Sequence, residues 1–97
     1  MYSFFNEMEY DEFVESLEAL AEDNDCLIPY IPEPEMVKAV LGHTEINDGI
    51  SLVYSVEKII ETLVERDHMT EEEAREHFHY NIERGAKYSK LNLIFVY

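Results

Sequence analysis

The residues best suited to chemistry are carboxylates near the start of the sequence. Five of them are spaced 4, 4, 3 and 4 residues apart, at Glu7, Asp11, Glu15, Glu18 and Glu22, with Glu12 and Asp23 flanking the row. On an α-helix this spacing places one carboxylate on the same face at about every 5.4 Å turn. Such a row of anions can imitate a phosphate backbone or dock on a basic groove. The simpler interpretation is a solvated face opposite an apolar one.

The negative charge is concentrated in the first third of the chain. The net charge is −15, from 22 acidic and 7 basic residues. Residues 1–37 hold eleven acids and neither Lys nor Arg, and residues 38–97 hold the other eleven acids with all seven bases. A field of this sign repels nucleic acid and anionic membranes and attracts basic proteins. We therefore expect a basic protein as the partner, with no direct contact to nucleic acid or to a membrane.

Histidines in the second half of the chain offer the chemistry of a metal site instead. His77 and His79 are two residues apart, so on a helix they point about 200° away from each other. Glu73 and His77 have the i, i+4 spacing of a chelating pair, but catalytic zinc usually takes three protein ligands. We expect no metal ion and no cofactor. A small hydrolase or metal protein built on Glu73 and His77 is the enzymatic alternative.

Common catalytic templates are missing from the sequence. The single cysteine, Cys26, excludes an internal disulfide and a multi-cysteine zinc site. There is no Gly-rich phosphate loop and no Gly-x-Ser-x-Gly elbow. The sequence therefore favours a non-enzymatic protein. A cytoplasmic location is expected, because the sequence has neither an apolar run of about 18 residues nor a basic leader segment.

The hydrophobic pattern predicts an α+β fold, with about four helices packed on a two- or three-stranded sheet in a single domain over residues 1–97. The predicted helices are 7–23, a short helix from Pro34 that ends at Gly42, a third from 56 to the break at 67–68, and 71–84. The remaining elements are an edge strand or docked loop at 26–31, a polar turn at 43–49, an internal strand at 50–54 and a last strand at 91–96. The last strand is apolar on both faces, so it lies either at the centre of the sheet or at an edge that pairs with a second copy.

Local signals set the limits of the helices. Asn6 with Glu9 resembles a capping box before the first helix, and Thr70 with Glu73 forms one before the fourth. Ser55 is the predicted cap of the third helix. Gly85 is predicted to end the fourth, as glycine commonly does after the last helical residue.

From Met36 onward the chain resembles a family of small uncharacterised proteins common in phage genomes. The resemblance is carried by the segments Met36–Gly42, Leu52–Glu61, Met69–Ala74, Phe78–Ile82, Gly85–Ala86 and Ile94–Val96. The chain has Ser89 and Leu93 where the family's Gly-Ala-Tyr-x-Gly-x-x-Thr-Pro loop usually has Gly and Pro. The resemblance implies a phage or mobile-element origin and no known reaction. The acidic N-terminal segment lies outside it.

Together these features predict a non-enzymatic inhibitor or decoy, a DNA mimic that occupies a basic, nucleic-acid-binding surface of a host protein such as an anti-phage defence protein. The expected partner-binding residues are carboxylates with apolar anchors beside them: Glu7, Asp11, Glu12, Glu15, Glu18, Glu22, Phe4, Phe5 and Tyr10. The alternative is a self-associating or antitoxin-like accessory protein. In that case the last strand and the apolar N-terminal residues form a homodimer interface, and the charge serves only solubility.

Overall fold

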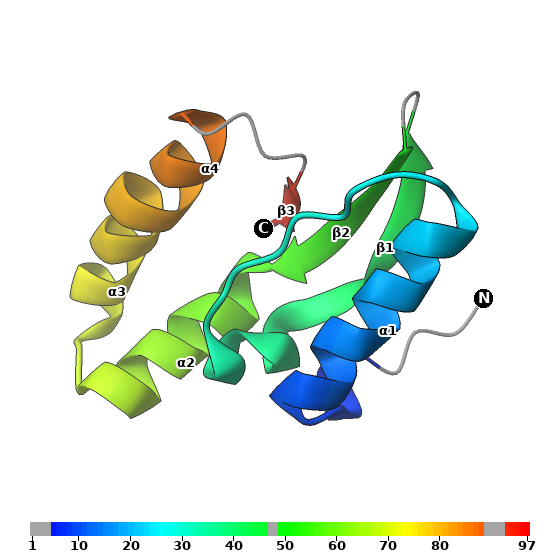
Figure 1. Ribbon diagram of the computed structural model, residues 1–97. Coiled ribbons are helices and arrows are strands. Elements are labelled where there is room, and N and C mark those ends of the chain that lie inside the picture. Colours follow the sequence, from blue (N-terminus) through cyan, green and yellow to red (C-terminus); the bar gives the residue numbers. More distant parts are fainter. Residues whose placement is uncertain (1–4, 47–48, 89–92) are drawn as a thin grey trace.

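The computed structural model describes residues 5–46, 49–88 and 93–97, and these form the predicted α+β fold, with four α-helices and a mixed three-stranded sheet (Figure 1). The elements in chain order are a 3₁₀ turn η1 (Phe5–Glu7), helix α1 (Tyr10–Asp23), a 3₁₀ segment η2 (Pro34–Ala39), strands β1 (Val40–Ile46) and β2 (Gly49–Ser55), helices α2 (Val56–Asp67) and α3 (Glu71–His77), a π-helical segment η3 (Phe78–Glu83), helix α4 (Arg84–Tyr88) and strand β3 (Leu93–Val96).

Strand β2 is the centre of the sheet. It pairs antiparallel with β1 and parallel with β3, in the order β1-β2-β3. Ile50, Leu52 and Tyr54 of β2 are buried on the core side, which confirms the prediction of an internal strand. A parallel pair needs a long crossover, and the helices between β2 and β3 provide it. Strand β3 lies at an edge, so of the two predicted placements the edge is confirmed.

Strand β1 corrects the sequence interpretation. The predicted helix to Leu41 and polar turn over 43–49 are wrong, because the 3₁₀ segment ends at Ala39 and β1 runs from Val40 to Ile46. A bulge between Val40 and Gly42 leaves Leu41 exposed and interrupts the alternation that would mark a strand. The strand forms because β2 supplies its hydrogen-bond partners, and an edge position tolerates polar side chains.

Residues 26–31, predicted as an edge strand or a docked loop, form a docked loop. Ile28 and Ile31 are buried in the core. The Ile31 backbone N–H donates a hydrogen bond of 3.0 Å to the hydroxyl oxygen of buried Tyr54. Among the described residues the loop pairs with no strand, and these apolar and polar contacts hold it on the core.

Helix α1 starts later than predicted. It begins at Tyr10, its N-cap residue is Glu9, and no side chain caps it, so the predicted capping box with Asn6 is wrong. Phe5 explains the difference, because its ring is only 8% exposed and packs edge-on against Phe13 at a centroid distance of 5.7 Å. The burial of Phe5 keeps Phe5–Glu7 in the separate turn η1, which comes before α1 in the chain.

The other predicted caps are correct, with one exception. The Ser55 hydroxyl accepts from the Lys58 backbone N–H, and Thr70 and Glu73 form both bonds of a capping box. Gly85 does not end the last helix, because helical structure continues through η3 and α4 to Tyr88. Glycine permits a helix end but does not impose one.

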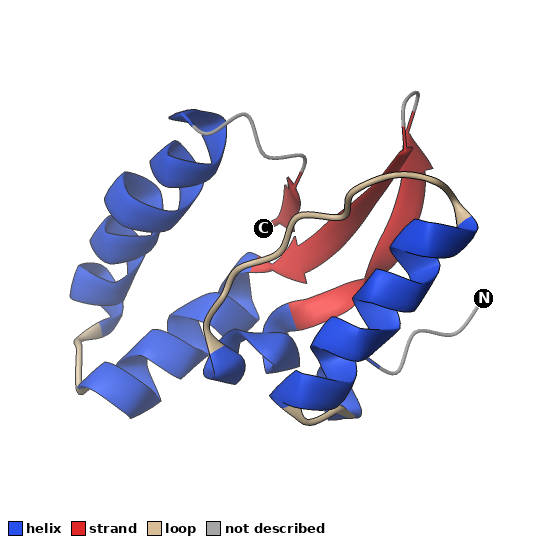
Figure 2. Cartoon of the chain, viewed as in Figure 1, coloured by secondary structure: helices blue, strands red, loops and turns tan. Residues whose placement is uncertain are grey.

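The helices lie at different ends of the molecule. Figure 2 shows α1 over the β1–β2 hairpin at one end, the α3–α4 segment at the opposite end and α2 between them. The molecule measures 41 × 27 × 20 Å along its principal axes. Surfaces carried by α1 and by α3 are therefore separate, and each can serve a different contact.

Candidate functional site

The outer side of α1 carries a continuous patch of carboxylates. We call it the acidic face and define it as the acids of this helix: Asp11, Glu12, Glu15, Glu18, Glu22 and Asp23. All of them are exposed. Within residues 5–46, 49–88 and 93–97, none of their side chains forms an ion pair or a hydrogen bond. The face therefore presents its full charge to solvent.

The spacing of these charges is close to that of a nucleic-acid strand. Helix α1 has 14 residues, which is a length of about 21 Å at 1.5 Å per residue. Six carboxylates over that length amount to one charge per roughly 3.5 Å. Phosphates recur at about 3.4 Å of axis along one strand of DNA. The acidic face thus matches a DNA strand in linear charge density.

Tertiary packing holds α1 in place although the like charges of the acidic face repel one another. Like charges at i, i+4 spacing cost about 0.2–0.5 kcal/mol per pair. Glu22 and Asp23 stand in the last turn, which has no basic residue, and negative charge there opposes the helix dipole. Burial of Phe13 and Leu17 on the opposite side holds the helix in place. Asp11 and Glu12 in the first turn interact favourably with the helix dipole, but the four later acids gain nothing from it, so their presence calls for another explanation.

Glu7 does not belong to the acidic face. It stands in η1, outside α1, and lines a polar surface pocket with Lys38 and Lys58. The predicted row of five therefore reduces to Asp11, Glu15, Glu18 and Glu22 on one side of α1, with Glu12 beside them. The break has the same cause as the late start of the helix, namely the burial of Phe5.

The predicted apolar anchors Phe5 and Tyr10 both pack within the chain. Phe5 is part of the core, and Tyr10 is half-buried with its ring 6.5 Å from that of Tyr30. Phe4 lies outside the described residues. Near α1 the exposed large apolar side chain is that of Leu27, at 92% exposure. Sequence reasoning missed Leu27 because an apolar run predicts burial.

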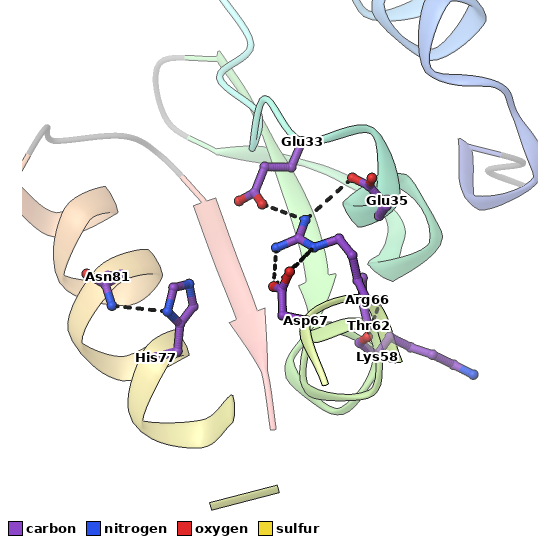
Figure 3. Close-up of polar contacts among 8 residues, drawn as sticks. All are labelled: Glu33, Glu35, Lys58, Thr62, Arg66, Asp67, His77 and Asn81. Carbon is purple, nitrogen blue, oxygen red and sulfur yellow. Dashed lines mark hydrogen bonds and ion pairs between the residues drawn. The ribbon is translucent and has the colours of Figure 1, made fainter. Parts of the chain in front are cut away.

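Several basic residues of α2 and α3 form ion pairs with acids outside α1. The Arg66 guanidinium donates to Glu33 at 2.7 Å and to Glu35 at 3.4 Å, and its Nε and Nη2 atoms bind both oxygens of Asp67 (Figure 3). Arg75 donates to Glu71 at 2.8 Å and to Glu57. Because Arg66 and Arg75 pair with acids outside α1, they do not neutralise the negative charge of this helix.

The Arg66 cluster fastens the end of α2 to the segment that precedes η2. The hydrogen bonds that Arg66 donates to Asp67 and Glu33 raise the pKa of Arg66, and the Arg66 guanidinium lowers the pKa of Asp67. An aspartate with a lowered pKa adds stability above its usual titration range and loses it as the pH falls through the folded-state pKa. Sequence reasoning missed this cluster because Glu33 lies 33 residues from Arg66 in the chain.

We expect Arg66→Ala to lower the melting temperature by roughly 4–8 °C, the shift that about 1 kcal/mol produces in a domain of this size. The difference from wild type should shrink at acid pH, where the partners are protonated. Thermal unfolding followed by circular dichroism measures both effects. Lys58→Ala is the matched control on α2, because the Lys58–Glu61 pair is exposed on both sides. Equal losses in both variants would contradict a structural role for the cluster.

Glu73 and His77 line one surface pocket, but each side chain has another partner. The Glu73 carboxylate accepts from the Thr70 backbone N–H at 2.9 Å, as the capping box requires. His77 Nδ1 lies 3.3 Å from the Asn81 amide nitrogen (Figure 3), and His79 pairs with Glu83 at 2.8 Å. Across the described part of the chain, no group of three His, Cys, Asp or Glu residues is arranged to hold a metal ion. The geometry therefore offers no support for the alternative built on Glu73 and His77.

Cys26 is half-buried and packs against the backbone of Gly49. A Cβ placed on Gly49 would lie 3.4 Å from the Cys26 Cβ. The thiol thus sits where the loop after α1 meets the first residue of β2, and its surroundings are those of a packing residue.

Comparisons of the chain with protein families, with curated proteins and with solved structures find no match. Among the helices that the structure describes, none has the length and apolar content needed to span a membrane.

Proposed function

We propose that this chain is a non-enzymatic binding protein whose acidic face docks on a basic, nucleic-acid-binding surface of another protein. The observation that carries the proposal is the exposed and unpaired state of the α1 carboxylates, whereas Arg66 and Arg75 pair with acids outside α1. A row of charges with the density of a DNA strand competes for the same cationic groups that bind phosphates. The partner is therefore a protein that binds nucleic acid by charge.

The target we propose is a host protein, and the inhibitor is phage-encoded and acts in the host cytoplasm. The resemblance of residues 36–97 to small phage proteins supports this origin. A protein of net charge −15 associates quickly with a cationic target, because opposite charges steer diffusional encounter. Occupying the groove would keep nucleic acid out of it, which is sufficient for inhibition without a catalytic step.

The test is capture of proteins from host lysate on the immobilised chain, followed by elution with double-stranded DNA. We expect the specific partner to be released by DNA and by high salt, because both compete for the same charges. A triple variant that changes Asp11, Glu15 and Glu18 to Lys should bind this partner with an affinity at least about tenfold lower. A partner that withstands both DNA and salt would contradict the proposal.

A matched control separates the face from the total charge. Glu45, Glu65 and Glu72 are exposed acids outside α1, and changing them to Lys alters the net charge by the same amount. This control variant should keep most of the affinity. If both triple variants lose affinity equally, the effect belongs to net charge and the acidic face is not the docking surface.

Self-association is the second candidate function, and the edge position of β3 favours it. Strand β3 pairs with β2 alone among the described strands, and Val96 and Tyr97 are exposed. An unpaired edge can accept a strand from a second copy. Sedimentation distinguishes the candidates: a homodimer that persists unchanged in high salt supports this function, and a monomer at all concentrations excludes it.

A further inference from the structure

A pocket of about 320 Å³ opens between α2 and the α3–η3 helix, on the part of the molecule opposite α1. Its floor is apolar and consists of Val56, Ile60 and Phe78, which are buried. Its rim carries two aromatic rings, Tyr80 at 61% and Tyr97 at 73% exposure. We call it the aromatic pocket. Its volume is at the lower end of the range for small-molecule sites.

The π-helical segment η3 shapes this pocket. Three side chains in sequence, Phe78, His79 and Tyr80, line it. The Phe78 ring packs edge-on against that of Tyr97 with centroids 6.2 Å apart. Short π-helical segments are frequent at functional sites, because they redirect side chains that an α-helix would point elsewhere. The local departure from α-helix therefore coincides with the pocket.

The charges around the pocket are negative on balance. Arg75 is part of the wall, but its guanidinium already binds Glu57 and Glu71. Glu76 also lines the pocket. Glu83 binds His79 and accepts a hydrogen bond from the Tyr97 hydroxyl. Glu76 is the carboxylate that lines the pocket, and the four acids Glu57, Glu71, Glu76 and Glu83 outnumber the two arginines Arg75 and Arg84 around it, which favours a cation over an anion.

The aromatic rim suits a cation as well. The Arg84 guanidinium lies over the Tyr80 ring, 5.7 Å from its centroid, so this ring already takes part in one cation–aromatic contact within the chain. Aromatic rings assembled around a site are the common means of binding organic ammonium groups. Because the floor of the pocket is apolar, a ligand that fits it also needs a hydrocarbon part to contact that floor.

We propose that the aromatic pocket binds a small arylalkylamine in its protonated form, with its hydrocarbon body on the apolar floor and its ammonium group between the rings of Tyr80 and Tyr97 and the carboxylate of Glu76. This site is independent of the acidic face, because it lies on the other end of the molecule. The proposed function and the proposed ligand can therefore fail separately.

The test is a titration of the 1–97 chain with phenethylammonium, followed by NMR chemical shifts of the tyrosine rings. We expect saturable shifts at Tyr80 and Tyr97, with a Kd of roughly 1 mM or tighter, as a ligand of this size allows. Phenylacetate has a similar body with the opposite charge, and ethylammonium has the charge without the ring. Neither should match the affinity of phenethylammonium.

Variants locate the binding. Tyr80→Ala and Tyr97→Ala should each weaken phenethylammonium binding about twofold to fivefold, the loss expected from one cation–aromatic contact at an exposed ring. Both side chains are exposed, so the fold should survive, and circular dichroism checks this. Leu27→Ala, at an exposed apolar residue in the loop after α1, is the control and should bind as wild type. Absence of saturable shifts, equal binding of phenylacetate, or unchanged affinity in both tyrosine variants would each overturn the proposal.

Discussion

Substitution of Phe13 by alanine is expected to lower the free energy of unfolding by about 3–5 kcal/mol. The Phe13 ring is fully buried and packs edge-on against Phe5 at 5.7 Å and against Tyr30 at 5.9 Å. Removing it leaves a cavity beside the two aromatic rings of Phe5 and Tyr30, in addition to the loss of apolar burial. Domains of this kind have only about 5–15 kcal/mol of stability in total, so the loss is a large fraction.

Urea denaturation at neutral pH measures this loss. Glu18→Ala is the matched control on the same helix, because Glu18 is exposed, and surface changes usually stay within about 0.5 kcal/mol. A loss below about 1 kcal/mol for Phe13→Ala would contradict the packing of α1 on the core. The variant also separates two roles of this helix, since a detached α1 keeps its charge but no longer presents it from a fixed surface.

Tyr54→Phe is expected to destabilise the protein at neutral pH by about 1–3 kcal/mol, the usual cost of a buried polar group left without a partner. The Tyr54 hydroxyl oxygen is the acceptor for the Ile31 backbone N–H, which a phenylalanine cannot replace. The substitution keeps the shape of the ring, so the loss reports the hydrogen bond rather than a cavity. Denaturation with urea at pH 7 provides the measurement.

The penalty of Tyr54→Phe should shrink in alkaline solution. Burial raises the pKa of Tyr54 to about 12 from an ordinary value of 10.0, although the Ile31 N–H bond lowers it. A folded-state pKa above the unfolded value means that the stabilisation is complete below pH 10 and is lost as the pH rises toward 12. Phenylalanine does not titrate, so the wild type loses this stability and the variant does not.

Unfolding free energies at several pH values between 8 and about 11.5 give the comparison, with Tyr80→Phe as the control. Tyr80 is exposed, and its substitution should leave the pH dependence of the wild type unchanged. A penalty for Tyr54→Phe that stays constant over this range would show that the Tyr54 hydroxyl is not buried as the structure describes.

Elements defined by local signals could be predicted from the sequence. Ser55 and the Thr70–Glu73 capping box satisfy backbone groups within a few residues of themselves, so their spacing is sufficient to place the starts of α2 and α3. The apolar run of β2 is equally local. The α+β class follows from these elements alone.

Elements that depend on distant partners could not be predicted. Strand β1 has few strand signals of its own and forms because β2 pairs with it. The start of α1 depends on whether Phe5 is buried, and Gly85 stays helical within a packed segment that includes buried Ala86. In each case a tertiary contact outweighs a local preference.

The same distinction applies to the candidate site. The spacing of Asp11, Glu15, Glu18 and Glu22 correctly places them on one exposed side of a helix, because periodicity is a local property. Phe5 is buried and so cannot serve as an exposed anchor, since burial of an aromatic ring is decided by what packs against it. Tyr10 is half-buried, and its role as an anchor stays a prediction. The binding role of the acidic face stays a prediction.

The unpaired acids of α1 and the ion-paired Arg75 of α3 lie at opposite ends of the molecule (Figure 1), which gives it an electric dipole between these ends. In the field of a cationic protein such a dipole experiences a torque as well as an attraction. The molecule would therefore rotate with α1 foremost before the surfaces touch, which increases the share of collisions that arrive in a productive orientation.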